Sequence, residues 1–213
     1  MNRDITKTKE DFLSHVYMRV VPSKYKEARE AAGALCFDVE DIGFCYCVDT
    51  VTPKGEKLIA TLKTGFLDCI KDHMGITEEE LRERAIRNSA EFDPATISTM
   101  SEMIAKISGI DSELSECDEH MWVVSTESMR FGASAIIYPG LLDEIAVKLG
   151  GNYYIIPSSI HEVIVVRESE GIELEVLNGL VKEVNAKEVE ENEVLANSVY
   201  RYRKSVGKLE KVS

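Results

Sequence analysis

The amino-acid sequence predicts an α+β fold, in which a mostly antiparallel sheet carries helices packed on one face. Strand-like segments occur in neighbouring pairs separated by single helices, not in strict alternation with them, and hairpins of this kind pair antiparallel. The composition, with 44% hydrophobic and 30% charged residues, is typical of a globular protein. In the C-terminal half the predicted order of elements is β-β-α-β-β-α-β.

The chain begins with a strand, a helix and three further strands. The segment "FLSHVYMRVV", residues 12–21, is apolar at odd and even positions and rich in β-branched and aromatic residues, although its beginning could equally be helical. The helix that follows has Pro22 near its first turn and Gly33 at its C-terminal cap. Strands are predicted at residues 34–39, 42–51 and 56–64, the last two joined by a turn at residues 52–55.

Helices follow in the middle of the chain. Thr77 is placed as an N-cap, and Glu80, three residues later, completes a capping box. A further helix repeats this pattern, with Asp93 as N-cap, Pro94 at its first position and Gly109 after its end. The predicted helices cover residues 65–74, 76–88 and 93–109.

The last hundred residues contain the hairpin and helix pairs that define the fold class. Short runs of β-branched and aromatic residues alternate with two amphipathic stretches of helical periodicity. Strands are predicted at residues 120–126, 133–138, 153–156, 161–168 and 198–204, with a return at 208–212, and helices at 140–151 and 172–186.

The length of 213 residues is compatible with a single domain, residues 1–213. The stretch "DSELSECDE", residues 111–119, is acidic and has no periodicity. It is predicted to be a linker that joins two possible sub-halves, residues 1–110 and 120–213.

Charge and hydropathy argue against several classes of function. Nucleic-acid-binding proteins gain affinity from Lys and Arg side chains that displace counterions from phosphates, so a net charge of −13 argues against direct nucleic-acid binding. No apolar run approaches the roughly 18 residues needed to cross a bilayer, and residues 1–10 lack the apolar core of a secretory signal. We therefore expect a cytoplasmic protein that does not associate with membranes.

The cysteines predict neither a disulfide framework nor a metal site. The chain has five, an odd number at irregular spacing, which is typical of a reducing compartment. Cys45 and Cys47 would lie on one face of a strand, but a metal site needs two further ligands, and no second closely spaced pair supplies them. Without a glycine-rich phosphate loop either, no metal and no cofactor is expected.

One stretch, "IIPSSIHEVIVV" at residues 155–166, combines residue types used in nucleophilic catalysis. Ser158 or Ser159 could act as nucleophile and His161 as base. On an extended strand, however, Glu162 points to the face opposite His161, and Ser159 and His161 lie roughly 6–7 Å apart between Cα atoms. A hydrolase would therefore need a carboxylate from another strand.

The same stretch also has a structural interpretation. Pro157 ends one strand, and serine hydroxyls commonly satisfy the backbone amides of a tight connection. The apolar residues after His161 occupy both faces, which is typical of a central strand covered on both sides. His161 is then a hydrogen-bonded group at the mouth of that strand, and still the side chain best suited to a function near neutral pH.

Several motifs resemble those of an uncharacterised bacterial family. They are Tyr138-Pro139-Gly140, Pro157 to Glu162, Val184-Asn185 and the pair Tyr200 and Tyr202, together with the helix that ends at Asn88. This pattern resembles a family of domains of unknown function from anaerobic gut bacteria and their mobile elements. The resemblance implies a bacterial, cytosolic setting and assigns no catalytic residue.

Taken together, these features favour an interaction module that binds a protein partner, with a regulatory or anti-defence role on a mobile element or phage. The alternative is a hydrolase-like enzyme that uses Ser159 or Ser158 with His161 and a carboxylate from another strand.

Overall fold

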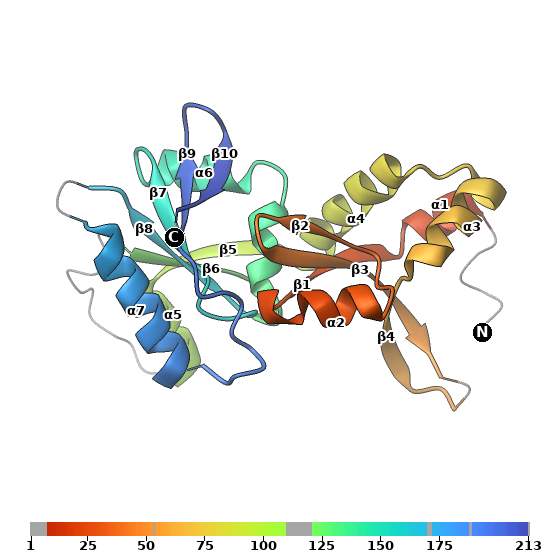
Figure 1. Ribbon diagram of the computed structural model, residues 1–213, viewed down its shortest axis with the longest axis horizontal. Coiled ribbons are helices and arrows are strands. Elements are labelled where there is room, and N and C mark those ends of the chain that lie inside the picture. Colours follow the sequence, from red (N-terminus) through yellow and green to blue (C-terminus); the bar gives the residue numbers. More distant parts are fainter. Residues whose placement is uncertain (1–7, 53, 110–120, 170–171, 188, 213) are drawn as a thin grey trace. The chain divides into compact units, whose positions relative to one another are not determined.

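The computed structural model describes residues 8–52, 54–109, 121–169, 172–187 and 189–212. The chain forms two compact units, residues 1–92 and 93–213 (Figure 1). The predicted acidic linker, residues 111–119, lies outside the described residues. It connects α5 (Met100–Ser108) to β6 (Met121–Thr126), two elements of the second unit.

The first unit is a four-stranded antiparallel sheet with helices before and after it. Strand β3 (Ile42–Val51) is central: β1 (Val16–Val21) pairs along one edge, and β2 (Cys36–Val39) and β4 (Lys57–Thr61) share the other. The predicted order of a strand, a helix and three strands is found. The helices of this unit are α1 (Lys9–Leu13), the 3-10 helix η1 (Ser23–Tyr25), α2 (Lys26–Ala31), α3 (Thr64–Met74) and α4 (Glu78–Phe92).

Helix α4 is attached to β1 by buried polar side chains. The Asn88 side chain donates from Nδ2 to the carbonyl oxygens of Leu13 and Val16, each at 2.7 Å, and so closes the connection between α1 and β1. Ser89 accepts a hydrogen bond from the backbone amide of Met18 at 2.7 Å. Buried backbone groups need such partners, so these two side chains satisfy groups that the helix and the sheet leave open.

Two cysteines of the first unit are joined by a disulfide, contrary to the expectation of reduced cysteines. Strands β2 and β3 form a hairpin whose register places Cys36 directly opposite Cys45, and their sulfurs are bonded. Glu40 allows the tight turn between them with a φ of 56°. The pairing depends on this register, which cysteine spacing alone does not reveal. Cys47 is buried and Cys69 exposed, both as free thiols.

The second unit is a six-stranded sheet in the order β10-β9-β7-β8-β6-β5. Every neighbouring pair is antiparallel, which confirms the predicted α+β class with antiparallel sheets. The described residues of this unit also form β5 (Ala95–Thr99), the 3-10 helix η3 (Gly132–Ile137), α6 (Leu141–Lys148), β7 (Tyr153–Ile156), β8 (Val163–Arg167), α7 (Leu174–Lys187), β9 (Tyr200–Arg203) and β10 (Lys208–Lys211).

Helices cover both faces of this sheet, where the sequence predicts one (Figure 1). On one face Tyr154 packs in a cluster with Leu177 and Val181 of α7. On the other, Tyr153 donates a hydrogen bond to the carbonyl of Leu142, and Tyr202 donates to Asp143 at 2.6 Å, both in α6. Because neighbouring residues of a strand point to opposite faces, the adjacent Tyr153 and Tyr154 place α6 and α7 on opposite sides.

The predicted strand at residues 133–138 is instead the 3-10 helix η3. Its small residues are buried. The backbone amide of Ser134 donates a hydrogen bond to the carbonyl of Phe131 at 2.9 Å, as in a 3-10 turn. Gly132 packs so tightly against β6 that any Cβ atom would collide with it. The apolar run looks like a strand because local periodicity does not distinguish a short buried strand from a short buried helical turn.

The predicted helix at residues 93–109 begins later than expected. Residues 95–99 form β5, an edge strand that pairs with β6. Thr99 is the actual N-cap and forms a capping box with Glu102. Asp93, the predicted cap, instead accepts hydrogen bonds from the backbone amide and the hydroxyl of Ser128 at 2.9 and 2.6 Å. Residues 95–99 include β-branched residues, which favour a strand, and Thr99 is as good an N-cap as Asp93. Together these two features explain the difference.

None of the helices formed by the described residues is long and apolar enough to cross a membrane.

A charged pair links the end of β8 to β9. Arg201 donates to both carboxylate oxygens of Glu168, with Nη2 at 2.6 and 2.8 Å, and the Tyr154 hydroxyl donates at 3.3 Å. Partial burial acts to raise the pKa of Glu168, but the hydrogen bonds from Arg201, Asn152 and Tyr154 and the positive charge of Arg201 together outweigh it and hold this pKa below its ordinary value.

We expect this pair to make the stability of the second unit depend on pH. Because the pKa of Glu168 is lower in the folded than in the unfolded chain, its stabilisation is complete above the unfolded pKa of about 4.3. It is lost as pH falls through the folded pKa. Glu168→Gln should therefore lower the free energy of unfolding by about 1 kcal/mol at pH 7 and by much less near pH 3.

Urea unfolding at both pH values measures this difference. Glu183→Gln is the control, because Glu183 forms an exposed i,i+4 pair with Lys187 and should change stability by less than about 0.5 kcal/mol. An effect of Glu168→Gln that is equally large at pH 3 and pH 7 would contradict the assignment.

Candidate functional site

The predicted site lies in a buried connection between β7 and β8. The sequence predicts a strand that begins at His161. Strand β8 in fact begins at Val163, so His161 and Glu162 precede the strand. Residues 157–160 are all buried, which is unusual for a connection between strands. The backbone amide of Ser159 bonds to the carbonyl of Glu162, and that of Ile160 to the carbonyl of Glu193 at 2.9 Å. A tight turn therefore sets the directions of the candidate side chains, which do not alternate between two faces as they would on a strand.

Both candidate serines bind Glu162. The hydroxyls of Ser158 and Ser159 donate to the same carboxylate oxygen, Oε1, at 3.2 and 2.7 Å. Ser159 also accepts a hydrogen bond from the backbone amide of His161 at 2.9 Å. Glu162 is therefore fixed by the two serines, and the serine hydroxyl protons point to a carboxylate and not to an imidazole.

His161 is held at both ring nitrogens by other parts of the second unit. Its Nδ1 accepts a hydrogen bond from the backbone amide of Phe131 at 3.3 Å, so Nε2 carries the proton. Nε2 faces Oε1 of Glu193 at 3.3 Å. Glu193 follows α7 and belongs to no strand. The Phe131 ring also packs against the imidazole, with 5.7 Å between ring centroids.

This arrangement brings the predicted residues together but does not align them for nucleophilic attack. A serine nucleophile needs its hydroxyl against one imidazole nitrogen, with a carboxylate on the other. The carboxylate is present in Glu193, whereas the second nitrogen is bonded to a backbone amide. The catalytic role of Ser158, Ser159 and His161 stays a prediction, and in this conformation it would require His161 to exchange a partner.

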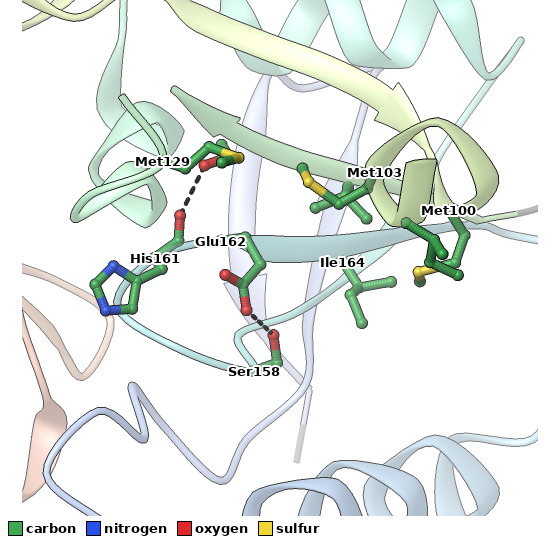
Figure 2. A pocket seen from close by; sticks show the side chains of 10 residues that line it. Met100, Met103, Met129, Ser158, His161, Glu162 and Ile164 are labelled. Carbon is green, nitrogen blue, oxygen red and sulfur yellow. Dashed lines mark hydrogen bonds between the residues drawn. The ribbon is translucent and has the colours of Figure 1, made fainter. Parts of the chain in front are cut away.

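A cavity of about 430 Å³ opens beside this connection (Figure 2). Met100, Met103 and Ile104 of α5 line one side, and Val123 and Ile164 form its base on the sheet. Figure 2 shows Glu162 between His161 and Ile164, with its carboxylate turned toward Ser158. The cavity is therefore apolar along α5 and the sheet and polar at one end. The remaining lining residues are Met129, Ser125, Ser158, His161 and Glu162.

The loop beside the polar end has a strained backbone. Met129 and Phe131 both lie in the left-handed region, with φ of 54° and 57°, which costs a non-glycine residue about 1 kcal/mol or more. The loop is held in place from both sides, since Ser128 bonds Asp93 and Phe131 bonds His161. Strain that persists because its surroundings fix it is common at binding sites, so it supports a functional assignment of this cavity.

Sequence reasoning missed several residues of the site. Glu193 lies 32 positions beyond His161, and no local pattern links the two. Ser125 donates to the carbonyl of His161 at 2.8 Å from the neighbouring strand. The spacing of Met100 and Met103 was visible, but methionines at helical spacing usually fill a core. None of the described residues form a group of three or more His, Cys, Asp or Glu able to hold a metal ion.

A family model described as a family of unknown function, DUF5688, matches residues 6–204. The chain belongs to the DUF5688 family. The match includes nearly the whole of both units of this DUF5688 chain, and with them the complete cavity. No curated protein and no solved structure matches the chain.

The other motifs of this DUF5688 chain that the sequence singles out are structural. Asn185 is buried and donates from Nδ2 to the carbonyl of Ala196 at 2.9 Å. Tyr200 and Tyr202 are almost fully buried, and Gly140 begins α6 with a φ of 77°. The segment from Pro157 to Glu162 contributes Ser158, His161 and Glu162 to the cavity, which makes it the candidate site of the second unit.

Proposed function

We propose that this protein is an interaction module that takes a side chain of a partner protein, one with an apolar stem, into the cavity beside Glu162. The observation that carries the proposal is that the hydroxyl and imidazole protons of the serine–histidine cluster are used within the fold. Side chains bonded in this way shape a cavity wall and are not available to activate a nucleophile.

The lining of the cavity suits binding. Methionine side chains are flexible and polarisable, and they are common on surfaces that adapt to a partner. The volume of about 430 Å³ falls at the lower end of ligand pockets, which run from about 300 to 1,000 Å³, and fits one or two side chains. Ile104 lies at the edge of the cavity with 51% of its surface exposed, as expected for a contact residue.

The binding proposal is tested by placing a charge at the mouth of the cavity. Ile104→Lys should reduce capture of the specific partner by about tenfold or more, because an unpaired ammonium group is costly to bury in an apolar contact. Val147→Lys is the matched control, since Val147 is an exposed apolar residue, 67% accessible, on α6 at the opposite face of the sheet. Quantitative affinity capture from host extract compares the two. A partner retained equally by both variants would contradict the proposal.

One observation favours the alternative, a serine hydrolase. Glu193 supplies His161 with a carboxylate from a distant segment, where the enzyme hypothesis expects one from another strand. A fluorophosphonate probe distinguishes the two functions. We expect no labelling of the wild-type protein above that of the Ser158→Ala/Ser159→Ala double variant. Labelling that disappears in Ser159→Ala would establish the hydrolase instead.

The cellular setting of the proposed module rests on the sequence alone. The resemblance implies a bacterial cytoplasmic setting, and a regulatory or anti-defence role on a mobile element or phage stays a prediction. The Cys36–Cys45 disulfide counts against a cytoplasmic location, because reducing compartments keep thiols unpaired.

A further inference from the structure

At the polar end of the cavity the described side chains offer acceptors, and their hydroxyl and imidazole protons are already used. The hydroxyl protons of Ser158 and Ser125 are donated to Glu162 and to the carbonyl of His161. The proton on His161 Nε2 faces Glu193. A serine hydroxyl that has donated its proton keeps lone pairs, so each serine can only accept from a ligand. A ligand that reaches this end must therefore be a hydrogen-bond donor.

Glu162 is the strongest of these acceptors. Both serines bond its Oε1, whereas its Oε2 accepts no hydrogen bond from the described residues. Lysine and arginine are absent from the side chains that line the cavity. A carboxylate oxygen next to an apolar wall, without a cation of its own beside it, is a site for a positively charged donor.

We propose that the cavity binds the side chain of a lysine on the partner protein, with Glu162 as the counter-ion of its ammonium group. The inference rests on the proposed binding function and names the group that the cavity takes. The four-carbon stem of lysine packs along an apolar surface such as the wall of Met100 and Met103, while its compact ammonium group needs only one carboxylate oxygen. Arginine fits less well, because its planar fork prefers two oxygens and Oε1 is already bonded twice.

The charge of the chain supports a basic partner. A net charge of −13 attracts cationic surfaces and speeds their association. The local geometry then selects among cationic groups by shape, since the polar end of the cavity is fixed by hydrogen bonds before a ligand arrives.

Methionine methyl NMR of the full chain tests this inference. Nα-acetyl-lysine N-methylamide should shift the methyl signals of Met100, Met103 and Met129. Its Nε-acetylated counterpart, which lacks the charge, should bind about tenfold more weakly, a difference of about 1.4 kcal/mol. The arginine analogue should also bind more weakly, and n-pentylammonium, tested in parallel, reports whether a free alkylamine suffices.

Two variants locate the counter-ion. Glu162→Gln keeps an oxygen for both serines but removes the charge, and should weaken lysine binding by about tenfold. Glu127→Gln removes an exposed charge close to the cavity without changing its lining, and should alter binding less than about twofold. Unchanged thermal unfolding of both variants shows that the fold is intact.

The outcomes separate this inference from the proposed function. Equal binding of the lysine compound and its acetylated counterpart, or an undiminished affinity in Glu162→Gln, overturns the lysine assignment and leaves the apolar cavity as a binding site. Binding of n-pentylammonium without the lysine compound assigns the cavity to free amines and overturns it as well. No methyl shift with any compound overturns both the inference and the proposed function.

Discussion

Gly132→Ala should lower the free energy of unfolding of the second unit by about 3 kcal/mol, one of the two largest effects that we expect for a single substitution. A Cβ atom at this position would lie within 3.0 Å of the Ser125 hydroxyl, the carbonyl oxygen of His161 and the backbone amide of Thr126. Two of these atoms belong to the backbone and cannot rotate away. Either β6 or the connection that carries His161 must then move.

Gly179→Ala is the matched control for this change. Gly179 lies inside α7, and an added Cβ would meet nothing within 4 Å. Alanine there should raise stability by about 0.5–1 kcal/mol, because glycine is a poor helix former. Urea unfolding followed by the fluorescence of Trp122, the single tryptophan, reports on the second unit. Equal stability of the two variants would show that η3 does not pack against β6 as described.

Asn88→Ala should destabilise the first unit by about 3 kcal/mol. The substitution removes the only described side-chain donor to the carbonyl oxygens of Leu13 and Val16, and leaves both buried without a partner. An unsatisfied buried polar group costs about 1–3 kcal/mol, and here there are two.

The control for Asn88 lies on the same helix. Glu91→Ala removes an exposed side chain of α4 and should change stability by less than about 0.5 kcal/mol. Hydrogen exchange of the β1 amides separates the loss of this attachment from general destabilisation. Were Asn88→Ala as stable as Glu91→Ala, the two hydrogen bonds would not hold α1 and β1 together.

Much of the fold follows from local signals in the sequence. Thr77 accepts the backbone amide of Glu80 at 3.1 Å, as the predicted N-cap requires, and α4 starts at the next position. The pairing of β7 with β8 follows from two apolar runs joined by Pro157 and the serines. Elements defined by a cap, a turn residue or a clear period can be predicted because their causes lie within a few residues.

The errors concern segments whose structure is decided by distant neighbours. Residues 95–99 form an edge strand because β6 is available to pair with them. Gly132 is buried against the end of β6. The disulfide depends on the register of β2 and β3, which places Cys36 opposite Cys45. Local propensity is a weak guide wherever tertiary contacts can override it.

The candidate site was predicted in part. Its side chains were identified from their types, and the strand that follows them is central in the sheet, between β7 and β6. The partners of His161 could not be predicted, because Glu193 and Phe131 approach it from segments about 30 residues away on either side. Face alternation also failed for Glu162, since His161 and Glu162 lie in a turn where a strand's period of two does not apply.

The buried connection between β7 and β8 reverses the usual relation between loops and tolerance to change. Insertions, tags and protease nicks are normally accepted at hairpin turns, because those residues contribute little to the interior. Residues 157–160 are as inaccessible as the strands they join, whereas residues 204–207, between β9 and β10, are exposed. An insertion library would thus find its permissive position at the second hairpin, and the first would behave as part of the core.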